Sequence, residues 1–196
     1  MNTPPLILAS SSPYRRALLE RLQLPFECIS PSIDESPQPG EGAAALVQRL
    51  AANKARVLMP DYPGRWIIGS DQVASLDGDI LTKPHTPERA EAQLARCSGR
   101  SVRFFTGLCL LDSNNGDAQV LCETFDVHFR SLNSKEIAAY IDKEQPLDCA
   151  GSFRMEGLGI ALFDRLEGRD PNSLIGLPLI ALCDMLRHAG IDPLAQ

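Results

Sequence analysis

The hydrophobic pattern of this chain changes repeatedly between two periods, which predicts alternating strands and helices. Short, continuously apolar runs such as 66–68 are typical of buried strands. Apolar residues that recur every three or four positions, as in 43–59, are typical of amphipathic helices. Such an alternation favours an α/β fold. Strands are predicted at 5–9, 26–30, 66–68, 101–112 and 118–130, and helices at 13–23, 43–59, 87–99, 134–143 and 178–189.

Turn and capping residues support several of these elements. Asn114-Asn115-Gly116 separates two long apolar segments and is a strong hairpin signal. Asn133 and Glu136 have the spacing of a capping box. Residues 149–163 are predicted to be extended chain interrupted by glycines. Because a hairpin pairs its strands antiparallel, the predicted sheet is mixed.

Composition restricts the classes of function. The 196 residues, 44% of them hydrophobic, suffice for one globular domain with one or two lobes. A net charge of −6 argues against non-specific nucleic-acid binding, and the longest late apolar run is too short to cross a membrane. Six cysteines form no C-x-x-C pair, and residues 1–5 lack the basic start of a secretory signal. We therefore expect a cytoplasmic protein with reduced thiols.

The first predicted helix begins with an unusual concentration of hydroxyl and guanidinium groups. Ser12 is expected to cap it and Pro13 to be its first residue. Arg15 and Arg16 then lie in the first turn, where the helix dipole disfavours cations. With Ser10 and the unpaired backbone N–H groups, they predict a site for an anion such as phosphate. The alternative is an ordinary capped helix whose arginines face solvent or pair with surface carboxylates.

Lys54 interrupts the apolar face that Leu50 and Leu58 share on their helix. Its side chain either extends along this face to solvent or directs an ammonium group toward an anion. Asp71 and Glu35 each follow a predicted strand, in the position where α/β sheets bind ligands. If these carboxylates converge, they suit a nucleotide-bound divalent cation, or a base acting on water. Spacing alone does not establish that they converge.

Two further residues suit either a ligand site or the solvated surface. Lys83 precedes a capped helix, and Glu156 lies in a glycine-rich stretch that allows close approach to a ligand.

The sequence contains no P-loop, no G-x-G-x-x-G and no Ser/His/Asp or Cys/His arrangement.

Together these segments resemble the Maf family of nucleoside triphosphate pyrophosphatases, nearly from end to end. The ordered set is far more specific than any one motif. Thr82 stands where many members have glycine, and Cys149 where many have lysine. The matching segments are Leu8-Ala9-Ser10-x-Ser12-Pro13-x-Arg15-Arg16, Asp34-Glu35, Asn53-Lys54-Ala55, Gly69-Ser70-Asp71, Lys83-Pro84, Phe125-x-Val127-x-Phe129-Arg130, Pro146-Leu147-Asp148 with Ala150-Gly151, and Asn172 with Gly176-Leu177-Pro178.

The resemblance implies one Maf-like domain over residues 1–196, often a homodimer. Its fold would be α/β and similar to that of inosine triphosphatases: an elongated mixed sheet flanked by helices, with two lobes and a deep central cleft. It implies hydrolysis of a nucleoside triphosphate to monophosphate and pyrophosphate with Mg²⁺ or Mn²⁺. By similarity, Asp71 accepts the proton of the attacking water, and Glu35 helps to place water or metal, so both are implied metal ligands. The residues implied to hold the triphosphate and stabilise its charge are Ser10, Arg15, Arg16, Lys54 and Lys83.

Base preference within the family follows the positions of Tyr14, Gln72 and Glu156. Members acting on dTTP and UTP typically have arginine, threonine and glutamine there. Members acting on 7-methyl-GTP have an aromatic residue, more often tryptophan, with glutamine and glutamate. N7-methylguanine is cationic, so Glu156 can pair with it and Tyr14 can stack on it. The implied function is therefore removal of 7-methyl-GTP from the nucleotide pool, and hence from RNA.

Two alternatives are a dTTP/UTP pyrophosphatase, which Gln72 and Glu156 disfavour, and a regulator of cell division that binds nucleotide without hydrolysis. A pure binder has no need of the water-activating Asp71.

Overall fold

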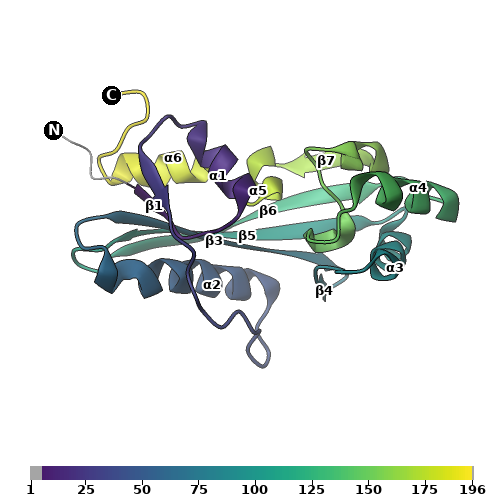
Figure 1. Ribbon diagram of the computed structural model, residues 1–196, viewed down its shortest axis with the longest axis horizontal. Helices are drawn as coiled ribbons and strands as arrows, with labels where there is room; N and C mark the ends of the chain where they lie inside the picture. The colour runs from purple at the N-terminus through teal and green to yellow at the C-terminus, as the bar shows by residue number, and fades with distance from the viewer. Residues whose placement is uncertain (1–5, 196) are drawn as a thin grey trace. The chain divides into compact units, whose positions relative to one another are not determined.

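The computed structural model describes residues 6–195 and consists of an open, mixed seven-stranded sheet flanked by helices (Figure 1). Its strands are β1 (Leu6–Leu8), β2 (Phe26–Cys28), β3 (Trp66–Leu76), β4 (Asp79–Leu81), β5 (Ser101–Asp112), β6 (Ala118–Phe129) and β7 (Phe163–Gly168). Its helices are α1 (Pro13–Glu20), α2 (Ala43–Leu58), α3 (Pro87–Cys97), α4 (Ser134–Glu144), α5 (Pro171–Ile175) and α6 (Leu179–His188).

Both parallel and antiparallel pairs occur in the sheet, which confirms the predicted α/β class with mixed pairing. The strand order is β2-β1-β3-β5-β6-β7, and β4 pairs with β3 beside this order. Strand β1 runs parallel to β2 and to β3, whereas the β3–β4 and β6–β7 pairs are antiparallel. Pro5, where the first strand was expected to begin, lies outside the described residues.

The chain divides into two compact units, and three strands contribute residues to both. The first unit contains residues 6–71, 106–123 and 170–195, and the second contains 72–105 and 124–169. The boundaries therefore fall within β3, β5 and β6. Each unit has its own packed interior.

Strand alternation gives the first unit a core on each face of its sheet. Leu6, Leu8 and Ile68 pack with residues of α1 and α6 on one face. Ile7 and Ile67 alternate with them and pack against α2 on the other face. Figure 1 shows α2 on the side of these strands opposite α1 and α6. Residues adjacent in a strand thus serve different layers.

Two glycines allow α2 to lie unusually close to the sheet. A Cβ added to Gly69 on β3 would lie 2.0 Å from the carbonyl oxygen of Ala51. A Cβ added to Gly107 on β5 would meet another α2 carbonyl oxygen at 2.1 Å. Any side chain at either position would therefore push the helix away. Because Gly69 lies two residues before Asp71, this contact brings Lys54 of α2 to the carboxylate.

Aromatic side chains fill the interior of the second unit. Phe104, Phe129, Phe153 and Phe163 contact one another edge to face, with ring centroids 4.9 to 5.6 Å apart. Helix α4 begins with the predicted capping box, in which Asn133 accepts from the backbone of Glu136 and Glu136 accepts from that of Asn133. The sequence pattern therefore located this helix correctly.

Three short elements, the length of one strand and one segment predicted to be extended differ from expectation. Strand β3 continues to Leu76 rather than ending at residue 68. Residues 149–163 are not simply extended, because they contain 3₁₀ turns at Ala150–Ser152 and Leu158–Leu162. The hydrophobic pattern did not predict β4, β7 or α5. These elements are three to six residues long, which is too short for a periodic signal.

Candidate active site

Lys54 lies at the centre of a charged cluster in the first unit. Its ammonium nitrogen donates to Asp71 Oδ1 at 2.6 Å and lies 2.8 Å from Glu35 Oε1. Lys54 and Asp71 are each only 7% exposed. The ammonium group therefore does not extend to solvent, and of the two interpretations the structure supports an ammonium held beside an anion.

The two candidate carboxylates converge on this ammonium group from different elements. Asp71 lies inside β3 rather than after a strand, which corrects the placement expected from the sequence. Glu35 lies in the segment between β2 and α2, and its side chain is exposed. Two carboxylates around one ammonium leave a net negative charge, which is suited to a cation or to a proton taken from water.

Arg15 belongs to the same electrostatic environment. Burial lowers the pKa of its guanidinium below the usual value, while the negative charges of Asp71 and Glu35 oppose this effect. Its Nε donates to the carbonyl oxygen of Gly176 at 2.8 Å. A guanidinium group anchored through Nε keeps its two terminal nitrogens for planar, bidentate contacts with an anion.

The hydroxyl groups near Arg15 shape the start of α1. Ser12 is the helix cap, and its hydroxyl accepts from the backbone N–H of Arg15 at 3.3 Å, as predicted. Ser10, which is buried, accepts from the backbone N–H of Ser12 at 3.1 Å. These bonds fix the turn that carries Arg15.

The other two candidates on α1 have different surroundings. Arg16 is 64% exposed at its side chain and pairs with Glu20 one helical turn later at 3.0 Å. This is the surface-carboxylate arrangement that the sequence left open for the arginines. Tyr14 is half-buried in the first turn.

Ser70 is a buried polar residue to which the sequence assigned no role. Its hydroxyl lies 2.9 Å from the carbonyl oxygens of both Gly107 and Gly176. Ser70 and Arg15 thus share the Gly176 carbonyl, which belongs to the turn between α5 and α6. The available signal was a serine between Gly69 and Asp71 in a buried strand, but its partner is 106 residues away.

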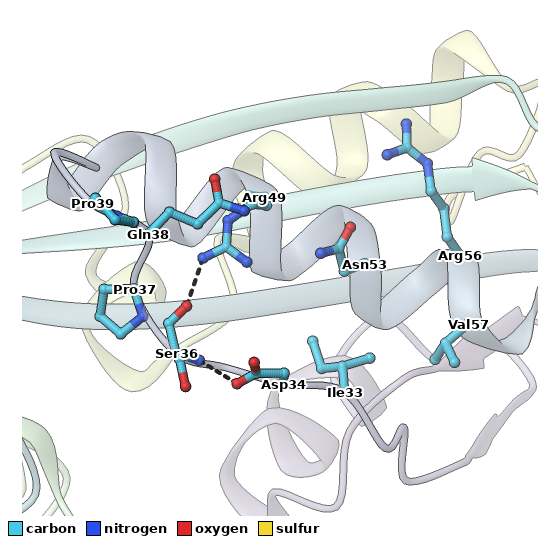
Figure 2. A pocket seen from close by; sticks show the side chains of 10 residues that line it. All are labelled: Ile33, Asp34, Ser36, Pro37, Gln38, Pro39, Arg49, Asn53, Arg56 and Val57. Atoms are coloured by element: carbon cyan, nitrogen blue, oxygen red, sulfur yellow. Dashed lines mark hydrogen bonds between the residues drawn. The ribbon is translucent and has the colours of Figure 1, made fainter.

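A hollow of about 590 Å³ lies between the outer face of α2 and the segment that joins β2 to α2, which contains Glu35 (Figure 2). Arg49 ties the segment to the helix, because it donates to the Ser36 carbonyl at 3.0 Å and to both carboxylate oxygens of Glu41. The Ser36 backbone N–H donates to Asp34 Oδ1 at 2.9 Å. Asp34 therefore stabilises a local turn, whereas Glu35 reaches Lys54. The hollow is lined by Ile33, Asp34, Ser36, Pro37, Gln38, Pro39, Arg49, Asn53, Arg56 and Val57.

The remaining candidates belong to the second unit. Gln72 is half-buried on β3, immediately after Asp71. Lys83 is exposed between β4 and α3, and Glu156 is exposed in the segment before the turn Leu158–Leu162. The structure thus brings Arg15, Lys54, Asp71 and Glu35 into one cluster and places these three residues in the other unit.

The donor set of the cluster fits a divalent cation that arrives with a phosphate ligand. Glu35 and Asp71 each contact Lys54 through one of their two oxygens. Mg²⁺ in nucleotide sites is commonly held by one or two carboxylates together with substrate phosphates. Within residues 6–195, no group of three or more His, Cys, Asp and Glu side chains is arranged to hold a metal ion.

In the same range no helix has the length and apolarity needed to cross a membrane.

Comparisons with known proteins find a matching family model and a relative that is similar over nearly the whole chain. A family model described as Maf-like protein matches residues 5–189. A protein of Pseudomonas aeruginosa named 7-methyl-GTP pyrophosphatase is 60% identical over 189 residues. That alignment covers 96% of this chain and 98% of the relative.

Proposed function

Because this chain belongs to the Maf family, we propose that it hydrolyses 7-methyl-GTP to 7-methyl-GMP and pyrophosphate. The main support for this proposal is the 60% identity to a 7-methyl-GTP pyrophosphatase over nearly the whole length of both proteins. The buried Lys54–Asp71 pair with Glu35 supplies a chemically suitable centre.

Asp71 is the proposed general base. The oxygen of a water molecule forms a bond to phosphorus, the bond between the α- and β-phosphates breaks, and Asp71 accepts the proton. Pyrophosphate leaves with the electron pair of the broken bond. Lys54 holds the Asp71 carboxylate at 2.6 Å, which fixes the direction in which the base faces.

The cations of the site have the proposed task of binding the triphosphate. Arg15 offers its terminal nitrogens, and Lys54, Lys83 and Arg16 add positive charge, with Ser10 as a hydroxyl partner. Charge on the phosphate oxygens rises as the bond breaks, so fixed cations stabilise the transition state more than the bound substrate. Local cations are needed because the chain as a whole has a net charge of −6.

Glu35 and Asp71 are the proposed protein ligands of a divalent cation, Mg²⁺ or Mn²⁺. When bound, such an ion neutralises phosphate charge and polarises the anhydride. Glu35 also orients Lys54 through their 2.8 Å contact.

Tyr14, Gln72 and Glu156 are the proposed readers of the base. The ring of Tyr14 stacks on cationic N7-methylguanine, an interaction worth about 0.5–2 kcal/mol. The Glu156 carboxylate pairs with the positive charge and accepts from the N–H edge of the guanine. We further propose that the enzyme is cytoplasmic and binds no nucleic acid, in keeping with its net negative charge and six free cysteines. The resemblance to the Maf family is the basis for proposing that it is a homodimer.

A nucleotide panel tests the proposal directly. Wild-type protein with Mg²⁺ is incubated with 7-methyl-GTP, GTP, dTTP, UTP, CTP and ITP, and the monophosphate and pyrophosphate are quantified. We expect the highest kcat/KM for 7-methyl-GTP. Preference for dTTP and UTP would refute the assigned base readers while leaving the chemistry intact.

A variant separates catalysis from binding. Asp71→Asn keeps the shape of the side chain but removes the proton acceptor, so turnover should be lost while nucleotide binding persists. A wild-type protein that binds nucleotides but hydrolyses none of them would instead support the alternative function, a regulator of cell division that binds nucleotide without hydrolysis.

A further inference from the structure

Glu156 lies at the tip of a compact turn in the second unit. The carbonyl oxygen of Arg154 accepts from the backbone N–H groups of both Gly157, at 3.4 Å, and Gly159, at 3.1 Å. These two bonds close the chain on itself around Met155 and Glu156. The position of Glu156 is therefore set by whatever holds the two ends of this turn.

Helix α4 holds both ends. The Tyr140 hydroxyl accepts from the backbone N–H of Arg154 at 3.0 Å. Glu144 Oε2 accepts from the backbone N–H of Leu158 at 2.7 Å, and its Oε1 accepts from Arg154 Nη1 at 3.2 Å. Tyr140 and Glu144, which lie one helical turn apart, thus form hydrogen bonds to the chain on either side of Glu156.

The glycines of the turn have steric reasons to be there. A Cβ added to Gly157 would lie 2.4 Å from Glu144 Oε1. A Cβ added to Gly159 would lie 2.2 Å from the carbonyl oxygen of Arg154. Gly159 therefore allows the turn to close on the Arg154 carbonyl, and Gly157 leaves room for the Glu144 carboxylate where it lies.

Glu144 occupies a position that does not suit its own helix. It is the last residue of α4, where the helix dipole is negative and a carboxylate is unfavourable. Its side chain is nevertheless only 14% exposed, and it is used to bind the turn rather than the helix end. Tyr140, which is 3% exposed, is likewise a buried group with its hydroxyl directed at the turn.

We propose that Tyr140 and Glu144 are positioning residues for base recognition: they fix the turn 154–159 so that Glu156 presents its carboxylate to the cationic base. This inference rests on the proposed function and deepens it. Neither residue contacts substrate in this scheme. Their effect should therefore fall on the discrimination between 7-methyl-GTP and GTP rather than on hydrolysis itself.

The test measures kcat/KM for both nucleotides with wild-type protein and with Tyr140→Phe, Glu144→Gln and Glu156→Gln. We expect Glu156→Gln to lower the ratio of the two values most, and Tyr140→Phe and Glu144→Gln each to lower it about tenfold, since a displaced recognition group loses its aligned contact. Values for GTP should fall less than those for 7-methyl-GTP, because GTP loses only the contact with its N–H edge and has no positive charge to pair with Glu156. Glu136→Gln is the matched control, because Glu136 lies on the same helix, pairs with Arg130 and does not contact the turn.

Double variants decide whether Glu144 and Tyr140 act through Glu156. In the Glu156→Gln background, adding Glu144→Gln or Tyr140→Phe should leave the ratio unchanged, because no carboxylate remains to be positioned. An unchanged ratio in both single variants, or the same further loss in the double variants, would overturn the inference while the proposed function stands. A wild-type protein without preference for the methylated base would overturn both. Melting temperatures of all variants separate loss of folding from loss of discrimination.

Discussion

The charged cluster of the first unit consists of two buried side chains, Lys54 and Asp71, and the exposed side chain of Glu35. The Lys54 ammonium group bridges Glu35 and Asp71 at 2.8 and 2.6 Å. Burial of such a group is costly unless it is paired, and removal of Lys54 would leave the two carboxylates without the cation between them. The arrangement therefore depends most on Lys54, which contacts both of the other members.

We predict that Lys54→Met lowers kcat/KM by about 10²–10³-fold, the loss typical when one fixed cationic or hydrogen-bonding group is removed from a transition state. Methionine keeps the length of the side chain but leaves Glu35 and Asp71 facing each other without a cation. Steady-state kinetics with 7-methyl-GTP measures the effect. Lys135→Met, at an exposed lysine of α4, is the control. Near-normal kcat/KM in Lys54→Met would refute the assigned role.

We predict that Ser70→Ala raises KM for the nucleotide and lowers the free energy of unfolding by about 1–3 kcal/mol. The hydroxyl is fully buried between the Gly107 and Gly176 carbonyls, and Gly176 anchors Arg15. Without it, a buried carbonyl loses a donor, and the turn that orients Arg15 is less constrained.

Ser113→Ala provides the matched comparison for this experiment. Ser113 is also buried and donates to the Tyr62 carbonyl at 2.7 Å, but it does not contact Gly176 or Arg15. It should cost similar stability in urea unfolding and leave KM unchanged. Equal KM values in both variants would show that Ser70 has only a structural role.

At the scale of elements, the segment between β2 and α2 is held by one strong ion pair. Arg49 Nε and Nη2 donate to the two Glu41 oxygens at 2.6 and 2.7 Å. These bonds, with the backbone N–H of Gln38, lower the pKa of Glu41 from 4.5 to about 2. Because the pKa is lowered by folding, the ionised carboxylate stabilises the folded state above about pH 4.5 and loses this effect as the pH falls toward 2.

We predict a matching pH dependence for Glu41→Gln. The urea midpoint of the variant should be lower than that of wild-type protein at neutral pH, and the difference should close as the pH falls from about 5 to about 2. Both midpoints are measured by circular dichroism across this range. A difference that does not depend on pH would exclude the ionised Glu41 as its source.

Elements with strong local signals were predictable, and those that depend on distant partners were not. Ser12 and Asn133 each cap a helix as the sequence indicated. The length of β3 was missed because Ser70 and Asp71 interrupt its apolar run, although the strand continues. The sequence could not show that these polar groups are paired with residues of α2 and of the α5–α6 turn.

At the scale of the whole molecule, the sequence was enough to predict which residues belong to the candidate site. It was not enough to predict that these residues lie close together. The convergence of Glu35 and Asp71 on Lys54 needs α2 to lie against β3, which Gly69 permits. The residue pattern identified Lys54, Asp71 and Glu35 as candidates and the family resemblance implied their roles, whereas packing supplied the geometry. The role of Ser70 emerged only from contacts, because its partner Gly176 is brought to it by the fold.

The charge of the whole chain and of its site leads to a prediction about metal dependence. The protein offers two carboxylates that already share Lys54, so the divalent cation should bind mainly as a complex with the triphosphate. We predict that a chelator abolishes hydrolysis of 7-methyl-GTP and that added Mg²⁺ restores it at once. Calorimetry of Mg²⁺ with protein alone should show only weak binding, with a Kd of about 0.1–1 mM or weaker, as in weak oxygen-ligand sites. Glu35→Gln should raise the Mg²⁺ concentration needed for half-maximal rate. Metal that stays with the protein through gel filtration without nucleotide would contradict this picture and indicate a resident ion.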